Sequence, residues 1–189
     1  MTWLDELPVW QQNDGADIFR AMDMAGKTVI DFGCGKGRYT LAAAQIAKTV
    51  YAADIDEHRL IEIESHGYKN IKTIKSDGTC KLDFAADNSI DMVLIYDLIH
   101  QLGPGRKTFL AETKRVLKNN GILSVLPFHI QGKEIDALFE EIKSYGFEPG
   151  DTYEDEGLHF EMHEFSHGNS GHIKDIPTGN ICNFVKAQA

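Results

Sequence analysis

The chain has 189 residues, of which 42% are hydrophobic and 25% charged, a balance typical of one globular domain with a packed core. Its net charge of −10 argues against a nucleic-acid partner, because phosphate binding requires clustered Lys and Arg side chains. No apolar run reaches the roughly 18 residues of a membrane span, and residues 1–6 lack a basic signal region, so we expect a cytoplasmic protein with no membrane partner.

The cysteines Cys34, Cys80 and Cys182 are widely spaced and odd in number, which suits free thiols in a reducing compartment. The sequence has no CxxC pair and no HxxxH pattern on an expected helix, so ligand spacing predicts no metal site. Basic residues cluster within residues 69–75 and 106–115. We interpret both clusters as solvated faces rather than as a nucleic-acid surface.

Segments of strand length alternate along the chain with amphipathic segments of helix length, a pattern typical of a mostly parallel sheet covered by helices. The predicted strands lie at 27–32, 49–54, 70–75, 90–96 and 121–126. The predicted helices lie at 14–24, 37–47, 57–66, 105–117 and 133–145. The sequence Lys-Asn-Asn-Gly at 118–121 is predicted to be a turn.

The C-terminal part predicts two further strands, at 157–165 and 180–186, joined by a loop rich in Gly, His and Ser. Strands joined without a crossover helix are normally antiparallel neighbours. We therefore predict a doubly wound α/β fold whose seven-stranded, mostly parallel sheet ends in an antiparallel hairpin. A single domain at 27–189 would follow an N-terminal segment and helix at 1–26, whose apolar side chains could form a lid or pack on the core.

A glycine-rich loop follows the first predicted strand and leads directly into a helix. Glycines occur at Gly33, Gly35 and Gly37, with Asp31 two residues before the first. Residues without Cβ allow a sharp turn and close approach of a ligand to the backbone. Dinucleotide-binding proteins use GxGxxG, which would require glycine where this chain has Arg38. No Gly-Lys-Ser/Thr follows, which excludes a phosphate-binding loop of the Walker type.

Acidic residues follow the second and third predicted strands. Asp54 closes the second strand, where a carboxylate can accept hydrogen bonds from both ribose hydroxyls of a nucleoside. The alternative, Asp56, suits the N-cap of the following helix. Asp77 begins the turn Asp77-Gly78-Thr79 and could accept from an exocyclic amine, although Asp-Gly also favours a simple turn.

The D-x-G-x-G-x-G pattern beginning at Asp31 resembles motif I of the class I S-adenosylmethionine-dependent methyltransferases. Residues 87–102 resemble the family's D-x-S-F-D-x-V…L-x-H-L stretch, and residues 114–121 resemble its R-V-L-K-P-G-G, with Asn-Asn in place of Pro-Gly. The resemblance covers about residues 27–127. It implies a Rossmann-like fold, S-adenosylmethionine as cofactor, and methyl transfer to a small-molecule acceptor that no motif specifies.

In this family the glycine loop packs against the methionine part of the cofactor, and the acid of the motif supports recognition of the cofactor's amino group. Asp54 then corresponds to the ribose acid and Asp77 to the adenine acid. The cofactor-binding residues that the resemblance implies are Asp31, Gly33, Cys34, Gly35, Gly37, Asp54, Ile55, Asp77, Gly78, Thr79 and Tyr96. Cys34 is interpreted as a packing residue, because the chemistry requires no protein nucleophile.

Acceptor-side residues are expected beyond the carboxyl ends of the fourth and fifth strands, where open sheets bind ligands. The candidates are Tyr96, Asp97, His100, Phe128 and His129. His100 is the best candidate for a general base, needed when the acceptor starts protonated. Its alternative is a histidine that faces solvent or contacts the cofactor without proton transfer.

Four histidines, His159, His163, His167 and His172, lie in the C-terminal part. If the sixth strand runs parallel to the first five, as in the family, they could converge with His100 and His129 on a metal ion or an anionic acceptor. The alternative is a polar exposed face followed by a flexible loop. Two other functions remain open: a non-catalytic S-adenosylmethionine-binding partner subunit, and an NAD-dependent oxidoreductase.

Overall fold

The computed structural model describes residues 14–155 and 179–188. Seven strands form one sheet. They are β1 (Thr28–Phe32), β2 (Thr49–Asp54), β3 (Ile71–Lys75), β4 (Ile90–Tyr96), β5 (Leu117–Leu126), β6 (Phe147–Asp155) and β7 (Gly179–Lys186). The helices are α2 (Asp14–Ala21), α3 (Arg38–Ala44), α4 (Glu57–Ser65), the 3-10 helix η1 (Ile99–Gln101), α5 (Gly105–Val116) and α6 (Lys133–Ser144).

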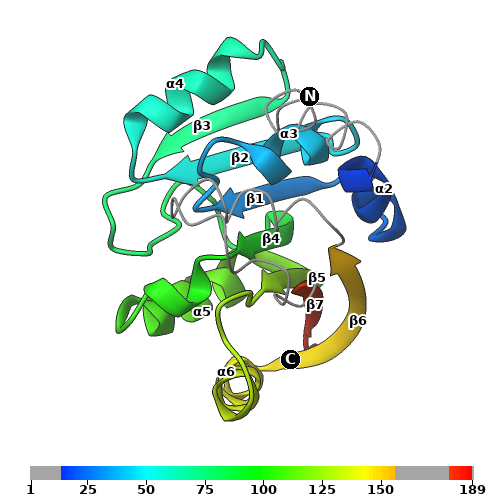
Figure 1. The fold of residues 1–189 in the computed structure, drawn as a ribbon, viewed down its shortest axis with the longest axis vertical. Helices are drawn as coiled ribbons and strands as arrows, with labels where there is room; N and C mark the ends of the chain where they lie inside the picture. The colour runs from blue at the N-terminus through cyan, green and yellow to red at the C-terminus, as the bar shows by residue number, and fades with distance from the viewer. Residues whose placement is uncertain (1–13, 156–178, 189) are drawn as a thin grey trace, which may run out of the picture.

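The sheet has the strand order β3-β2-β1-β4-β5-β7-β6 (Figure 1). The first five strands pair in parallel, whereas β7 pairs antiparallel with both β5 and β6. β6 therefore runs parallel to β5. The predicted doubly wound α/β fold with a seven-stranded sheet and a terminal antiparallel pair is confirmed.

Both faces of β1, β2 and β4 are largely buried, as the mostly apolar sequences of these strands require. In β1, Ile30 and Phe32 face a core that includes α5 and α6, whereas Val29 faces a core that includes α2 and α3. Helix α4 packs through Leu60 and Ile63 beside α3. Figure 1 shows α2 and α3 on one side of the central strands and α5 and α6 on the other.

The sixth strand was wrongly placed by the sequence. The strand that pairs with β7 is Phe147–Asp155, directly after α6, and not 157–165. Pro149 and Gly150 are residue types that favour turns, but here they lie where the pairing with β7 shifts register between Pro149 and Thr152. Residues 157–165 and the four C-terminal histidines lie outside the described residues, as does the predicted lid segment 1–13.

The predicted turn at 118–121 is also wrong, because β5 begins at Leu117 and includes these residues. The pairing of β4 with β5 shifts register between Ile90 and Met92, and Asn120 adopts a positive φ of 62°. The Asn-Asn-Gly sequence is therefore an irregularity within a strand rather than a connection between elements. Among the described residues, no helix has the length and apolar character needed to cross a bilayer.

Candidate active site

The carboxyl ends of the five parallel strands meet at one edge of the sheet. The segments that leave them contain the glycine loop after β1, Asp54 at the end of β2 and the turn 76–79 after β3. Asp97 follows β4 and His129 follows β5. Ligands of open α/β sheets bind at this edge, so the candidate residues lie where the fold places a binding site.

The glycine loop is fixed by backbone hydrogen bonds to β2. The amides of Gly33 and Cys34 both donate to the carbonyl of Ala53, at 2.7 and 3.1 Å. Gly33, Gly35 and Gly37 have positive φ values of 78°, 54° and 83°, a conformation that side chains with Cβ rarely adopt. The loop therefore requires glycine at all three positions for conformational reasons.

Only the middle glycine of the loop faces open space among the described residues. A Cβ at Gly33 would lie 2.2 Å from Cδ2 of Leu98, and a Cβ at Gly37 would lie 2.8 Å from Cγ1 of Ile63. At Gly35 the nearest atom would be Nη1 of Arg59, at 3.9 Å. Gly33 and Gly37 thus allow close packing, while Gly35 leaves a surface that a ligand can approach.

Asp54 holds the loop in place from the end of β2. Its carboxylate is 5% exposed and accepts hydrogen bonds from the amides of Gly35 and Asp56, both at 2.8 Å. The guanidinium of Arg59 lies 3.9 Å away. Asp56, in contrast, caps α4 by accepting from the amide of His58 at 3.0 Å. The two acids therefore have the different positions that the sequence predicted.

Asp31 lies beneath the loop and is 3% exposed. The hydroxyl of Thr40 donates to its Oδ2 at 2.5 Å. Burial raises the pKa of Asp31 to about 6, because desolvation of the carboxylate outweighs the Thr40 hydrogen bond. Burial also raises the pKa of the Cys34 thiol far above its ordinary value. Cys34 is therefore a neutral packing residue, as expected, and not a thiolate nucleophile.

The turn after β3 is tied to Asp54. The amide of Ser76 donates to the Asp54 carbonyl at 2.9 Å, which places the following residues beside the end of β2. Asp77 accepts from the amide and hydroxyl of Thr79, at 2.9 and 2.6 Å, and these bonds lower its pKa. Ile55, next to Asp54, is 66% exposed and presents an apolar side chain beside these polar groups.

Tyr96 lies at the carboxyl end of β4, but its side chain enters the core rather than the open edge. Its ring is 6% exposed and packs edge-on against Tyr39, with ring centroids 4.6 Å apart. Its hydroxyl pairs with that of Ser124 at 2.8 Å. The structure thus places the Tyr96 side chain beneath the site, so that only its backbone lies toward the edge.

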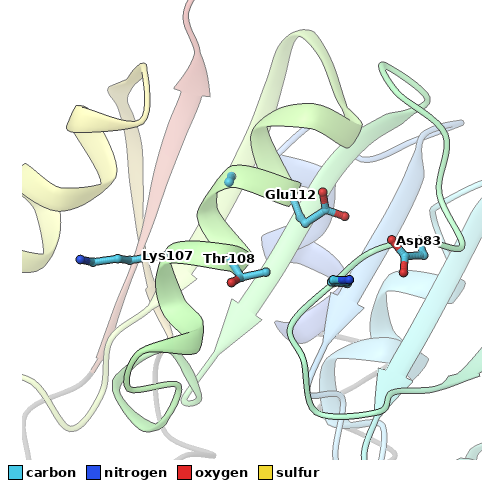
Figure 2. Close-up of a pocket in the computed structure, with 6 residues that line it drawn as sticks. Asp83, Lys107, Thr108 and Glu112 are labelled. Atoms are coloured by element: carbon cyan, nitrogen blue, oxygen red, sulfur yellow. The ribbon is translucent and has the colours of Figure 1, made fainter.

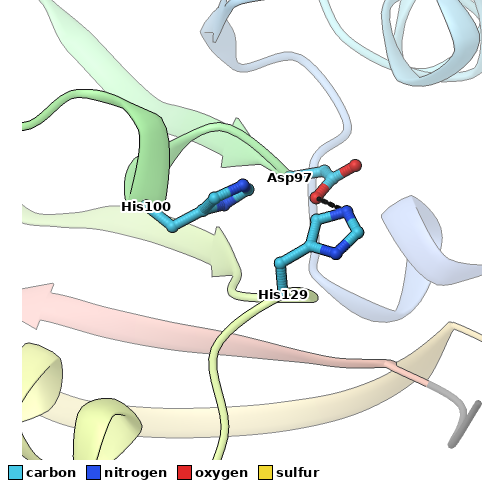
Figure 3. Close-up of side chains that lie close together, drawn as sticks. All are labelled: Asp97, His100 and His129. Carbon is cyan, nitrogen blue, oxygen red and sulfur yellow. Dashed lines mark ion pairs between the residues drawn. The ribbon is translucent and has the colours of Figure 1, made fainter.

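Three acceptor-side candidates come together beyond β4 and β5 (Figure 3). Each of Asp97, His100 and His129 offers one atom that could bind a metal ion. These three atoms all lie within 4.8 Å of one another. His129 Nε2 lies 3.2 Å from Oδ1 of Asp97, and the two imidazole rings meet edge-on with centroids 5.0 Å apart. Burial lowers the pKa of His100, with the field of Asp97 opposing this shift. The shift favours the uncharged form of its imidazole.

A shallow hollow on the flank of the molecule is separate from this edge. Figure 2 shows it between α5 and the segment before β4, lined by residues that include Asp83, Lys107 and Glu112. Glu112 already accepts from the amide of Leu82 and pairs with Arg115. These interactions fix the chain that connects β3 to β4, so we assign the hollow a structural role.

Sequence reasoning missed three residues that shape the site. Thr40 pairs with Asp31, Leu98 packs on Gly33, and Arg59 lies between Asp54 and Asp56. A threonine in the first turn of α3, directly after the glycine loop, was the one available signal. Leu98 acts through a contact with a loop that is distant in the sequence, whereas Arg59 follows its acidic partners closely along the chain.

Together, the strand order, the glycine loop and the acids at the strand ends define a nucleoside-binding α/β enzyme fold. A family model described as a methyltransferase domain matches residues 30–125. The chain belongs to the class I S-adenosylmethionine-dependent methyltransferase family. The predicted family and its cofactor, S-adenosylmethionine, are thereby confirmed, and the NAD-dependent alternative receives no support.

Similarity to individual proteins extends over parts of the chain. A ribosomal protein L11 methyltransferase from Legionella pneumophila is 36% identical over 81 residues, which cover 42% of this chain and 28% of that protein. A Mycolicibacterium smegmatis protein named as a probable S-adenosylmethionine-dependent methyltransferase is 27% identical over 144 residues, covering 68% of this chain and 54% of that protein. The chain thus spans less than two thirds of the length of either relative.

The fold is shared with solved methyltransferase structures. One is the 1,6-didemethyltoxoflavin-N1-methyltransferase of Burkholderia thailandensis, with bound 1,6-didemethyltoxoflavin and S-adenosylhomocysteine. It superposes with a TM-score of 0.67 at 16% identity and covers 98% of this chain and 84% of that one. At this level of identity the likeness establishes the architecture.

Proposed function

We propose that this chain is an active S-adenosylmethionine-dependent methyltransferase that acts on a small-molecule acceptor. The observation that carries the proposal is the open face of Gly35 beside the buried Asp54 carboxylate. A nucleoside that carries a methionine side chain fits this arrangement, because the glycine surface admits its chain and the carboxylate can accept its ribose hydroxyls.

The remaining predicted cofactor residues take complementary roles. Exposed Ile55 offers an apolar surface to the adenine ring, and Asp77 can accept from the adenine amine while Gly78 and Thr79 hold its turn. Asp31 lies on the side of the amino-acid group, where an ionised carboxylate would favour the cofactor's ammonium. The other predicted residues shape the site by packing and offer the cofactor no polar side-chain group. They are Gly33, Cys34, Gly37 and Tyr96.

The reaction needs little from the protein beyond placement. The bond between sulfur and the methyl carbon of the sulfonium breaks as the acceptor's lone pair forms its bond to that carbon, and S-adenosylhomocysteine leaves. Holding the two reactants in line supplies up to about 7–11 kcal/mol of the barrier. An acceptor that begins as a hydroxyl, thiol or protonated amine must also lose a proton.

We propose His100 as the catalytic residue on the acceptor side. Its uncharged imidazole keeps a lone pair that can receive the acceptor's proton, and it lies beyond β4 where the acceptor must approach the methyl group. Contact between Leu98 and the glycine loop supports this placement, because it ties the turn before His100 to the cofactor side.

Several features favour a small acceptor and argue against nucleic acid. Arg106 pairs with Glu141, and Arg115 pairs with Glu112 and Asp87, so these cations are engaged within the fold. The structural neighbour from Burkholderia thailandensis methylates a small heterocycle by its name. We further propose a cytoplasmic location and a single catalytic domain at 27–189, preceded by the N-terminal segment and helix at 1–26.

Calorimetric titration with S-adenosylmethionine, S-adenosylhomocysteine and NAD tests the cofactor assignment. We expect binding of the first two and none of NAD. Release of S-adenosylhomocysteine in the presence of acceptor panels of phenols, thiols, amines and carboxylates then tests catalysis. Cofactor binding with no turnover on any acceptor class would favour the non-catalytic partner subunit, and the absence of cofactor binding would refute the proposal.

A further inference from the structure

We propose that Asp97, His100 and His129 form a binding site for a divalent transition-metal ion of the Zn²⁺ class. The inference rests on the proposed function in one respect, because the ion would act on the methyl acceptor. The proposed site does not involve the C-terminal histidines. The proposal also departs from the expectation, drawn from ligand spacing in the sequence, that no metal is bound.

The geometry suits a single ion. Zinc binds His nitrogens and carboxylate oxygens at about 2.0–2.2 Å, so two ligands of one ion can lie up to about 4.4 Å apart. The 3.2 Å between His129 Nε2 and Asp97 Oδ1 falls within this range. The third ligand atom lies within 4.8 Å of both, so a small rotation of the His100 side chain would complete the set.

The three side chains come from the segments that follow the neighbouring strands β4 and β5. The Asp97 amide donates to the carbonyl of Leu126 at 2.9 Å, which fixes the residue at the junction of β4 and β5. Asp97 also adopts a positive φ of 55°, a strained backbone conformation for an aspartate at a functional edge. His129 packs edge-on against Phe128, with centroids 5.2 Å apart. Figure 3 shows the three side chains pointing toward one another.

His100 provides the independent observation that points to a ligand. Its Nδ1 is buried, yet it has no hydrogen-bond partner among the described residues. A buried polar nitrogen is normally paired, and an unpaired one calls for an explanation such as a bound ion. One ring nitrogen of His100 also lies within 4.8 Å of a carboxylate oxygen and of a second imidazole nitrogen, an arrangement typical of metal ligands.

The ligand set indicates the metal and the class of acceptor. Two imidazoles and one carboxylate suit zinc and iron(II), and catalytic sites with three protein ligands keep a further position open. An acceptor hydroxyl or thiol at that position would lose its proton to solvent more readily, since a bound cation lowers its pKa. The resulting anion attacks the methyl group while the S–CH₃ bond breaks. In this arrangement the His100 lone pair binds the ion, and the ion takes over the activation assigned above to the imidazole.

The site adjoins the proposed cofactor site without sharing its residues. Leu98, next to Asp97, occupies the space that a side chain at Gly33 would need. The metal ligands therefore begin one residue from a contact with the cofactor loop. An acceptor held at the ion would lie on the methyl-donor side of the sheet edge, which is the placement that in-line transfer requires.

The test uses the full chain, purified without a histidine tag and freed of metal with EDTA. Titration with Co²⁺, followed by visible absorption, and competition with Zn²⁺ should give one ion per chain. The variants H100A and H129A should weaken Co²⁺ binding by at least about 10- to 100-fold. Removing a residue that only hydrogen-bonds to a metal ligand already costs this much, and these variants remove a ligand itself. H66A, which removes an exposed histidine at the end of α4, is the matched control and should bind Co²⁺ normally.

The double variant H163A/H167A separates this site from the C-terminal histidines and should also retain the ion. Circular dichroism and S-adenosylmethionine titration of each variant check folding and the cofactor site. Co²⁺ binding that survives in folded H100A and H129A, or is absent from the wild type, would overturn the metal site. Normal Co²⁺ binding without S-adenosylmethionine binding would contradict the proposed function and leave the metal site supported.

Discussion

Replacement of Asp54 by alanine tests whether one carboxylate both orders the glycine loop and binds the cofactor. The substitution leaves the amides of Gly35 and Asp56 without their acceptor, and an unsatisfied buried donor costs about 1–3 kcal/mol. Because the face of Gly35 is open to water, we expect the total loss of stability to be about 2 kcal/mol. The domain should remain folded.

The same variant loses its hydrogen bonds to the cofactor. Bonds to a charged acceptor contribute about 1.5–3 kcal/mol, which corresponds to a rise of about 10- to 150-fold in the Kd for S-adenosylmethionine. Calorimetry below the unfolding temperature, with urea denaturation to measure stability, separates the two losses. Binding at wild-type affinity by folded Asp54→Ala protein would refute the assignment.

Asp56→Ala provides the matched control. Asp56 lies two residues away and also bears a carboxylate, but it caps α4 by accepting from the His58 amide. Loss of an N-cap costs about 1 kcal/mol of stability. We therefore expect slightly reduced stability and unchanged cofactor affinity. An equal loss of affinity in both variants would mean that the loop responds to helix α4 as a whole and not to Asp54.

Three further predictions address the loop, its buried acid and the N-terminal segment. Gly35→Val should abolish S-adenosylmethionine binding, measured by calorimetry, because its side chain would fill the open face; wild-type binding would refute the site. The raised pKa of Asp31, about 6, makes its carboxyl mostly protonated below that pH, so affinity for the cofactor's ammonium should rise with pH and level off above 6. In Asp31→Asn protein this pH dependence should disappear. Deletion of residues 1–10 should raise the KM for the acceptor, whereas a lower Tm with unchanged KM would indicate simple packing.

The central part of the fold could be predicted because its signals are local. Strands β1, β2 and β4 are largely apolar runs bounded by polar or glycine residues, and the glycine spacing at 33–37 predicts the loop. β6 could not be placed in the same way. Its Pro149 and Gly150 are tolerated only because pairing with β7 absorbs a register shift, and β7 lies about thirty residues further along the chain.

The site shows the same division. Asp54 and the glycines were predictable, since each follows directly from its position at the end of a strand. The meeting of Asp97 with His129 was not, because it depends on the register of β4 against β5, in which Tyr96 lies beside Leu126. The separate packing roles of Gly33 and Gly37 likewise depend on Leu98 and Ile63, side chains from other elements.

The position of β7 between β5 and β6 has a consequence for synthesis on the ribosome. β6 is translated before β7, yet among the seven described strands β7 is its one pairing neighbour. Until residue 186 has left the exit tunnel, β5 carries an unpaired edge and β6 has no strand to join. An exposed edge of this kind can pair with other chains. The nascent protein must therefore pass through a stage in which its cofactor half is complete and its far edge is open to aggregation.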